Sequence, residues 1–426
     1  MREMKDSGID WIGTIPQDWQ LSKIGSLYTQ RNEKVSDKDY QPLSVTMQGI
    51  LPQLATAAKT NDGGNRKLVR VGDFAINSRS DRRGSCGISP LDGSVSLINI
   101  ILTPRTAMHP GYYNWLFHTT LFADEFYKWG HGIVADLWTT RWQEMKSITV
   151  PVPEYAEQER IAAFLDAECA EIDAVLEKTR ASIEEYKKLK QAVITQAVTK
   201  GIRGDRPMKD SGIEWIGDIP ESWEVSSVRY IGQLQNGISK GGEFFGKGFP
   251  FVSYGDVYKN YELPHSVSGL IDTTEDERAT YSVEYGDIFF TRTSETIEEV
   301  GFSCVCKRSI PNATFAGFII RLRPFCTDEK ILTDYAKYYF RGEHIRAYLV
   351  KEMNLVTRAS LGQTLLKGMS VIVPPKSVQK EIAEYLDDKC ADIDALVAKK
   401  QQYLTEIENY KKSLIYEYVT GKKEVV

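Results

Sequence analysis

Two polar loops carry side chains that are well suited to hydrogen bonding with nucleic-acid bases or phosphates. They read NSRSDRRGS from Asn77 to Ser85 and TRTSETIEEVG from Thr291 to Gly301. The candidate side chains are Arg79, Arg82 and Arg83 in the first loop and Arg292, Thr293 and Ser294 in the second. An arginine can fork onto O6 and N7 of guanine, and hydroxyl groups read other base edges or hold phosphates. Contact with double-stranded DNA is one interpretation, and a pair of solvated turns is the other.

Four further short segments supply candidates of the same kind. They are Ser44, Thr46 and Gln48 in PLSVTMQG, Tyr254, Asp256 and Tyr258 in VSYGDVYKN, Thr140 and Arg141 in TTRW, and Arg358 and Ser360 in TRAS. The net charge of −5 gives no general attraction to a polyanion. Any contact with DNA must therefore be local.

Motifs that would indicate catalysis fail when their spacing is read in full. The stretch GGEFFGKG has the glycine and lysine spacing of a P-loop, but Gly248 stands where the magnesium-binding Ser or Thr belongs, so we interpret it as a glycine-rich loop. The six cysteines and five histidines show no zinc-ligand spacing. The sequence predicts neither a catalytic site nor a metal site. A self-sufficient methyltransferase or nuclease with unfamiliar motifs remains the alternative.

Length and composition indicate a protein with more than one core. A chain of 426 residues with 42% hydrophobic residues can bury two or more substantial cores. No apolar run approaches the roughly 20 residues that cross a bilayer, and the N-terminus lacks the apolar stretch of a secretory signal. We therefore expect a soluble, cytoplasmic protein with reduced thiols.

The chain is internally duplicated. Met4–Trp19 and Met208–Trp223 are identical at twelve of sixteen positions, and Val150–Ala174 returns as Val371–Ala395. Between these boxes, a Gly-Asp turn leads into an apolar run and then a polar loop in each half, at Gly72 and at Gly286. This pattern predicts two similar mixed α/β (α+β) domains that are related by a pseudo-two-fold axis.

The closing segments predict two long helices with matched seams. A heptad pattern of mostly apolar residues runs from Leu165 to Ala197, and an equivalent pattern runs from Leu386 to Tyr418. Lys190 and Lys411 interrupt the two seams at equivalent places. We expect helices of roughly 40 residues that pack as an antiparallel coiled coil and separate the two domains. Gly201 and Gly421 would end them. The alternative is two unrelated amphipathic helices, each covering its own domain.

Three duplicated features resemble the specificity subunit of Type I restriction-modification enzymes. They are the box D-S-G-I-x-W-I-G-x-I-P, the helix start P-x-x-x-x-Q-x-x-I-A-x-x-L-D and the loop that opens G-D-I-F-F-T-R-T. The resemblance covers both halves. One departure is that Glu157 of the first helix start is replaced by Val378 in the second. This replacement would weaken one of two otherwise similar partner contacts.

The resemblance implies a non-catalytic subunit with four regions. Residues 1–152 and 206–373 would be target recognition domains that each read one part of a bipartite asymmetric DNA target. Residues 153–205 and 374–426 would be helical regions that bind two methyltransferase subunits, and restriction subunits would join through the complex. S-adenosylmethionine, ATP and magnesium would then reside on the partner subunits. A third interpretation is a coiled-coil scaffold whose bodies bind protein.

Overall fold

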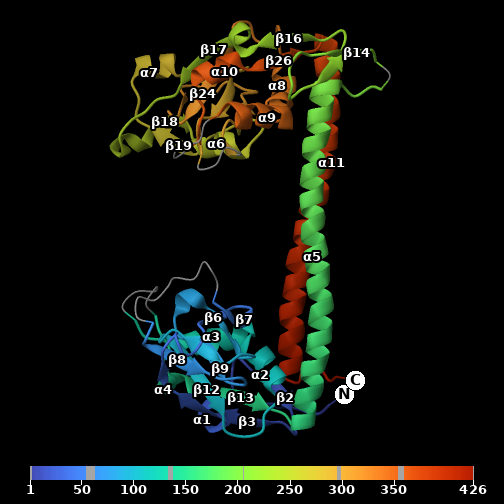
Figure 1. Cartoon of the computed structure of the whole chain (residues 1–426). Coiled ribbons are helices and arrows are strands. Elements are labelled where there is room, and N and C mark those ends of the chain that lie inside the picture. Colours follow the sequence, from blue (N-terminus) through green and yellow to red (C-terminus); the bar gives the residue numbers. More distant parts are fainter. Residues whose placement is uncertain are drawn as a thin grey trace. The chain divides into compact units, whose positions relative to one another are not determined.

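The chain folds into two compact units that share a pair of long helices. The computed structural model describes residues 2–53, 63–132, 138–204, 206–294, 299–353 and 359–425. Unit 1 consists of Met1–Arg180 and Gln401–Val426, and unit 2 of Ala181–Lys400. The helices α5 (Tyr155–Lys200) and α11 (Lys376–Val419) each contribute one half to unit 1 and the other half to unit 2 (Figure 1). No described helix is long and apolar enough to cross a membrane.

Each unit is built on a four-stranded antiparallel sheet with the same strand order. In unit 1 the order is β10 (Cys86–Ile88), β9 (Phe74–Asn77), β12 (Asn99–Pro104) and β4 (Tyr28–Arg31). In unit 2 the order is β22 (Ser303–Val305), β20 (Ile288–Thr291), β24 (Ile319–Pro324) and β17 (Gly232–Asn236). The predicted duplication of a mixed α/β domain is therefore confirmed at the level of topology.

Smaller elements complete each body. Unit 1 adds β1 (Met4–Asp6), β2 (Thr14–Pro16), β3 (Gln20–Lys23), α1 (Ile24–Leu27), β5 (Lys34–Val35), β6 (Leu43–Thr46), β7 (Gly49–Pro52), β8 (Arg66–Val69), η1 (Ser80–Arg82), β11 (Gly93–Val95), α2 (Pro110–Phe117), α3 (Thr120–Lys128), α4 (Trp142–Met145) and β13 (Thr149–Val152). Unit 2 adds β14 (Met208–Asp210), β15 (Asp218–Pro220), β16 (Glu224–Ser227), η3 (Val228–Tyr230), η4 (Gly242–Phe244), β18 (Phe245–Val252), α6 (Tyr254–Lys259), β19 (Gly269–Ile271), α7 (Glu275–Thr280), β21 (Thr293–Ser294), β23 (Thr314–Phe315), α8 (Thr333–Tyr339), α9 (Glu343–Glu352), β25 (Ala359–Ser360), α10 (Gln363–Gly368) and β26 (Ser370–Val373).

Strand β9 in unit 1 and strand β20 in unit 2, the central strands that follow the Gly-Asp turns, are buried on both faces because their side chains alternate between two cores. In unit 1, Phe74 and Ile76 pack in the cluster that contains α2 and α3, whereas Ala75 packs with residues of β6, β7 and β8. In unit 2, Ile288 and Phe290 pack in the cluster that contains α8 and α9, and Phe289 packs on the opposite face. Successive strand residues point to opposite faces. The apolar run after each Gly-Asp turn is therefore a buried strand, as predicted, and the polar loop begins where that strand ends.

The glycine-rich stretch GGEFFGKG is not a loop throughout, which corrects the sequence interpretation. Gly242–Phe244 forms a short 3₁₀ turn, and the residues from Phe245 onward enter strand β18. Pairing with β19 is irregular between Phe245 and Phe249. Gly248 has φ +88°, and a β-carbon there would lie 2.7 Å from the carbonyl oxygen of Ile271. Glycine is needed in this segment because two strand backbones approach closely at an irregularity.

The two long helices pack against each other in antiparallel register. Lys411 pairs with Asp173 at 2.6 Å in unit 1, and Lys190 pairs with Asp394 at 2.6 Å in unit 2. The lysines that interrupt the predicted seams thus form the same cross-helix ion pair in both units. The partner number falls along α11 as the number rises along α5, so the predicted antiparallel coiled coil is confirmed. Such partly exposed pairs contribute little stability and mainly help to specify register.

Glycines end both helices as the sequence predicted. Gly201 and Gly421 have φ +82° and +71°, a left-handed conformation that other residues rarely adopt. Each glycine also lies close to a tryptophan of the duplicated box, because a β-carbon on Gly201 would be 3.3 Å from Trp223 and one on Gly421 would be 3.0 Å from Trp19. The C-terminus of each long helix therefore packs on the entry box of one body.

Candidate nucleic-acid interface

The residues of two separate candidate segments in unit 1 line one cavity. The turn between β6 and β7 and the loop after β9 enclose about 1010 Å³. Six of the predicted site residues line it, namely Ser44, Thr46, Gln48, Arg79, Arg82 and Arg83. The loop is closed at its base because the Asn77 N–H donates to the Ser85 carbonyl at 2.9 Å. Two segments more than 30 residues apart thus contribute donors to one concave surface.

The three arginines of this cavity differ in how they are held. Arg83 forms an ion pair with Asp124 and lies over the ring of Tyr127, whereas Arg82 is 69% exposed and lies 3.8 Å from Asp81. Arg79 is half-buried, and no hydrogen bond or ion pair engages its guanidinium among the described residues. Its backbone is fixed, since its N–H donates to Asn77 Oδ1 at 3.0 Å. Arg79 is therefore a positioned donor whose guanidinium has no acceptor within the described part of the chain.

The predicted residues of the β6–β7 turn differ in role, because one stabilises the turn and another is exposed at its tip. Thr46 Oγ1 donates to the Gly49 carbonyl at 2.9 Å and accepts from the Gln48 N–H at 3.0 Å, so this hydroxyl stabilises the turn. Gln48 and Met47 are exposed at the tip, and Met47 is 71% exposed. Gln48 is the better candidate for direct contact, because its amide can both donate and accept.

Other residues of the same cavity were missed by sequence reasoning. Arg66 lines the cavity, but it is 5% exposed and donates to Ser94 Oγ and to the Ser94 carbonyl, each at 2.9 Å. Burial lowers the pKa of its guanidinium. Asn77, Ser85, Ser96 and Asn99 also line the cavity. The position of Asn77 and Ser85 at the two ends of the arginine loop was the available signal for those two.

Thr140 and Arg141 lie beside the arginine loop but have different surroundings. Thr139 forms an antiparallel bridge with Arg79, and the Thr140 N–H donates to the Ser78 carbonyl at 3.0 Å. The Thr140 side chain is buried, and its hydroxyl donates to the Phe126 carbonyl at 2.9 Å. Arg141 is exposed. Thr140 therefore supports the arginine loop from the protein interior, and of these two residues only Arg141 is at the surface.

The candidate residues of unit 2 meet through a short two-stranded ladder. Strands β21 and β25 pair Thr293 with Ser360. The Arg292 carbonyl accepts from the Leu361 N–H at 2.7 Å, and the Arg292 N–H donates to the Phe318 carbonyl at 2.9 Å. This ladder is the counterpart of the bridge between Arg79 and Thr139. Arg358 lies outside the described residues.

A cluster of hydroxyls surrounds Glu299 in unit 2. Ser294 Oγ donates to one oxygen of this carboxylate at 3.1 Å, and Tyr258 Oη donates to the other at 3.2 Å. The rings of Tyr254 and Tyr258 stack at 5.8 Å between centroids, with an interplanar angle of 19°. Burial raises the pKa of both tyrosines, so both are neutral hydrogen-bonding groups near pH 7.

Asp256 has a local structural task that sequence reasoning did not foresee. Its Oδ2 accepts from the Ser253 N–H at 2.8 Å and from Ser253 Oγ at 2.7 Å. The Ser253 hydroxyl in turn accepts from the Asp256 N–H at 3.3 Å, which completes a capping box at the start of α6. The sequence Ser253-x-x-Asp256 was the signal for this cap.

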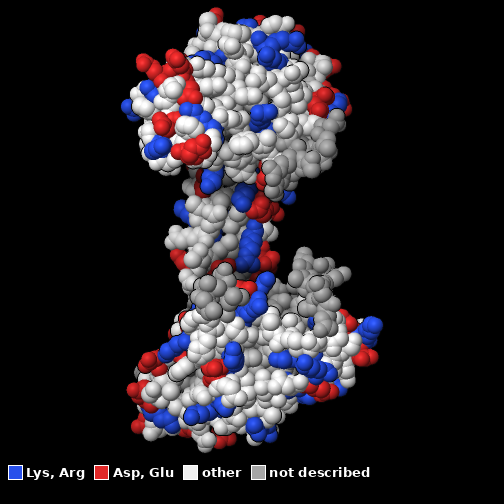
Figure 2. Space-filling view, turned by 90° about the vertical axis from the view of Figure 1, so that its left-hand side faces the viewer, with Lys and Arg blue, Asp and Glu red and all other residues white. Residues whose placement is uncertain are grey.

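Charge on the molecular surface is mixed. On the face drawn in Figure 2, Lys and Arg side chains are interspersed with Asp and Glu on both bodies. This distribution agrees with the net charge of −5. Among the described residues, no group of three or more His, Cys, Asp or Glu side chains is arranged to hold a metal ion. The chemistry that the geometry supports is hydrogen bonding by arginine, amide and hydroxyl groups from loops on a rigid scaffold.

Comparison with known proteins identifies relatives in both sequence and fold. Residues 220–408 match the family model of the Type I restriction modification DNA specificity domain. The EcoKI specificity subunit of Escherichia coli is 24% identical over 281 residues, which is 65% of this chain and 58% of that protein. The StySPI subunit of Salmonella potsdam is 24% identical over 65% of this chain and also 58% of its own length. The alignments thus span under two thirds of these two relatives.

Longer matches come from an archaeal relative and from solved structures. The MjaVIII specificity subunit of Methanocaldococcus jannaschii is 23% identical over 96% of this chain and 94% of that protein. A chain from a study of assembly and conformational transition of the type I R-M system has a TM-score of 0.73 at 14% identity, covering 96% of this chain and 99% of that one. The HsdS subunit of Thermoanaerobacter tengcongensis gives 0.50 at 16% identity, covering 96% and 98%. At such identities the structures establish a shared fold.

Proposed function

We propose a DNA-recognition function from the premise that this chain belongs to the specificity-subunit family of Type I restriction-modification systems. Each body would read one half of a bipartite, asymmetric DNA target, using loops that project from a duplicated frame. The observation that carries this proposal is the equivalence of the two frames together with the difference between their loops. Ser78 in unit 1 and Arg292 in unit 2 are at equivalent positions. The Ser78 carbonyl accepts from the Thr140 N–H, and the Arg292 carbonyl accepts from the Leu361 N–H. Each donor directly follows the residue, Thr139 or Ser360, that pairs with the loop.

The duplicated frame and its divergent loops suit a modular reader. A common frame holds each loop in the same orientation to its sheet, whereas an Arg-rich loop and a hydroxyl-rich loop present different donors and acceptors. Different base-edge patterns in the major groove require such differences. Two units of one chain can then specify two unlike half-sites without change of fold.

The helical regions would hold the partner subunits. The resemblance supports two methyltransferase subunits bound through α5 and α11, with restriction subunits joining through the complex. S-adenosylmethionine, ATP and magnesium would be bound by those partners, and this chain would be a non-catalytic scaffold in the cytoplasm. The Glu157 carboxylate is engaged within unit 1, since Arg2 and Trp19 Nε1 both donate to it. It is therefore a weaker candidate for partner contact than its position in the motif suggested.

A body exchange tests the modular proposal directly. Residues 206–372 would be replaced by the corresponding body of a relative with a different target, and methylated positions would be mapped in cells that express the partner subunits. We expect one half of the methylated motif to change and the other half to stay. A change in both halves would refute independent reading. The reciprocal exchange of residues 1–152 is the matched control, and it should alter only the other half.

Activity of the isolated chain distinguishes the rival functions. A self-sufficient methyltransferase or nuclease would methylate or cut DNA without partners, and we expect neither reaction from the purified chain. A protein-binding scaffold would shift no DNA in a mobility assay even with methyltransferase subunits present. We expect a shift that depends on the target sequence.

A further inference from the structure

Phe318 is an exposed phenylalanine directly beside the polar loop of unit 2. Strands β20 and β24 pair Thr291 with Ile319, and their ladder continues for one more step, since the Arg292 N–H donates to the Phe318 carbonyl at 2.9 Å. Thr291 and Ile319 are each 0% exposed, whereas Phe318 is 63% exposed. The ladder therefore passes from the core to the surface at this step.

The register places Phe318 opposite Arg292. Residues opposite each other on antiparallel strands project their side chains to the same face, with β-carbons about 5 Å apart. Arg292 begins the loop that contains the candidate hydroxyls of Thr293 and Ser294. Among the described residues, no aromatic ring or cation packs on the Phe318 ring. An apolar side chain is thus presented next to the donors and acceptors of this loop.

Unit 1 has an apolar residue at the equivalent step. Asn77 pairs with Asn99, and the next step is the hydrogen bond from the Ser78 N–H to the Ile98 carbonyl at 3.3 Å. Ile98 is 36% exposed, and it lines the cavity that Arg79 also lines. A single exposed apolar residue is common on protein surfaces. An exposed apolar residue at the same step of both frames, beside the polar loop each time, indicates a shared function.

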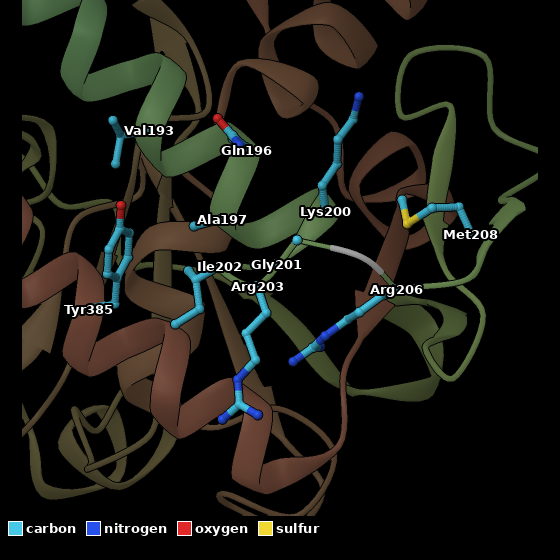
Figure 3. A pocket seen from close by; sticks show the side chains of 11 residues that line it. Val193, Gln196, Ala197, Lys200, Gly201, Ile202, Arg203, Arg206, Met208 and Tyr385 are labelled. Atoms are coloured by element: carbon cyan, nitrogen blue, oxygen red, sulfur yellow. The ribbon is translucent and has the colours of Figure 1, made fainter.

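Two other exposed apolar side chains of unit 2 have different surroundings. Phe325 is 67% exposed, but it follows the last residue of β24, whereas Phe318 precedes the first. A strand of six residues spans roughly 20 Å. Met208 is 42% exposed and lines a pocket of about 340 Å³ at the end of α5, where Figure 3 shows it on the same side as Arg206. Phe318 is thus distinguished by its place beside the Arg292 loop and not by exposure alone.

The major groove of DNA offers an apolar group that suits such a side chain, the 5-methyl group of thymine. The other groups that distinguish the base edges there are hydrogen-bond donors and acceptors. A phenyl ring placed against one of those groups would remove its water without replacing the hydrogen bond, which is unfavourable. The polar contacts would come from Arg292, Thr293 and Ser294 beside the ring.

We infer that Phe318 contacts the 5-methyl group of a thymine in the half-site read by unit 2, and that Ile98 does the same in the half-site read by unit 1. Both are then specificity-determining residues that recognise an A·T pair by its methyl group. This inference rests on the proposed function, because it requires that each unit reads DNA. It adds that each half-site contains a thymine, on one strand or the other, whose methyl group carries part of the recognition.

Deoxyuridine tests the contact, because it pairs as thymidine does and lacks only the 5-methyl group. The full chain in complex with methyltransferase subunits would be titrated with duplexes in which each thymine of the mapped target is replaced singly. The exchange of residues 206–372 identifies the half-site of unit 2. We expect one replacement there to weaken binding about fourfold, the factor that corresponds to burial of one methyl group. Phe318→Ala should bind the thymine and deoxyuridine duplexes equally at that position.

Phe325→Ala is the matched control, since it removes a similarly exposed phenyl ring from the other end of β24. It should keep the wild-type preference for thymine, and Ile98→Ala should lose that preference only in the half-site of unit 1. The inference is overturned if the half-site of unit 2 contains no thymine, or if the wild type tolerates every replacement in it.

Phe318→Ala separates a methyl contact from other uses of the ring. If this variant weakens binding to all duplexes alike and keeps the preference for thymine, the ring acts by insertion between bases or by packing on the DNA backbone, and the inference is overturned. A complex that binds no duplex in a sequence-dependent way would refute the proposed function and this inference with it. Sequence-dependent binding without a preference for thymine over deoxyuridine would refute this inference alone.

Discussion

Thr293 pairs with Ser360 across the short antiparallel ladder of unit 2, and Arg79 pairs with Thr139 at the corresponding place in unit 1. Each pairing joins the loop that follows the central strand to the segment that leads into the last short helix of the body. The joined segments are 60 or more residues apart in sequence in both units. Candidate residues from distant segments therefore share one support, and their side chains can act on a common ligand.

Arg79 is expected to read a base. Because its backbone is fixed and its guanidinium lacks a protein acceptor among the described residues, Arg79→Ala should cost about 1 to 3 kcal/mol in binding and relax one position of one half-site. Arg82→Ala and Arg83→Ala, if these residues contact phosphates, should weaken binding to all sequences alike. Affinity would be measured on a panel of single-base target variants with methyltransferase subunits present. Arg70→Ala is the control, because Arg70 belongs to the same unit but does not line the cavity. Unchanged affinity and motif in all three variants would mark the loop as a solvated turn.

Glu157→Val should destabilise unit 1. The substitution leaves Arg2 and the buried Trp19 Nε1 without their shared acceptor, and loss of a buried acceptor typically costs about 1 to 3 kcal/mol. The free energy of unfolding in urea is the measurement. Glu159→Val changes an exposed glutamate two residues away on the same helix, so it should have a much smaller effect. Unaltered stability with weaker capture of methyltransferase subunits would instead assign Glu157 to a partner contact.

The prediction of the fold from sequence succeeded where the pattern was local and repeated. Heptad spacing predicted α5 and α11, and their equal length and matched seam interruptions at Lys190 and Lys411 predicted that they pack against each other. The aspartate partners of these lysines were not foreseen. The motif residues Gln158 and Gln379 were taken only as signs of family. Both are buried and fasten a helix start to its body, because Gln158 Oε1 accepts from the His109 N–H at 2.9 Å and Gln379 Oε1 accepts from the Leu332 N–H at 2.7 Å.

The candidate sites were harder to predict because a polar side chain can bond to its own turn, helix cap or supporting backbone and is then not available to a ligand. The hydroxyls of Thr46 and Thr140 and the carboxylate of Asp256 have the right chemistry for base contact, yet each is engaged with nearby backbone or a cap. Arg66 joins the cavity only because β8 packs beside β11, a pairing that spacing does not reveal. Local patterns thus locate the loops, and hydrogen bonds within the turns and caps, together with tertiary contacts, decide which of their side chains are available.

Stability should decrease in acid because of His344. This residue is 3% exposed, neither ring nitrogen has a partner among the described residues, and burial lowers its pKa to about 3. The unfolded chain has a histidine pKa of about 6.5, so it binds the proton more readily than the folded chain. Above about pH 6.5 His344 is neutral in both states and does not lower the free energy of unfolding. Below that pH the free energy of unfolding falls as the pH decreases toward 3, by at most about 1.4 kcal/mol per pH unit. In urea unfolding between pH 7 and 4, His344→Leu should lack the part of the decrease in stability that is due to His344. The variant His265→Leu changes an exposed histidine and should retain that decrease. Parallel pH profiles for His344→Leu and wild type would show that His344 is not its cause.

The helix pair is expected to set the distance between the two half-sites. One heptad inserted after Glu177 in α5 and one after Glu408 in α11 would keep the seam in phase, because the ion pair of Arg180 with Glu408 marks these positions as facing each other. Seven residues add roughly 10 Å of helix, which is about three base pairs at a rise of about 3.4 Å. Mapped methylation should then show unchanged half-sites with a spacer longer by about three base pairs. A four-residue insertion in α5 alone breaks the heptad phase and serves as the control for seam disruption, because it should reduce stability. If the active heptad variant returned the original spacer, α5 and α11 would serve only to hold partners.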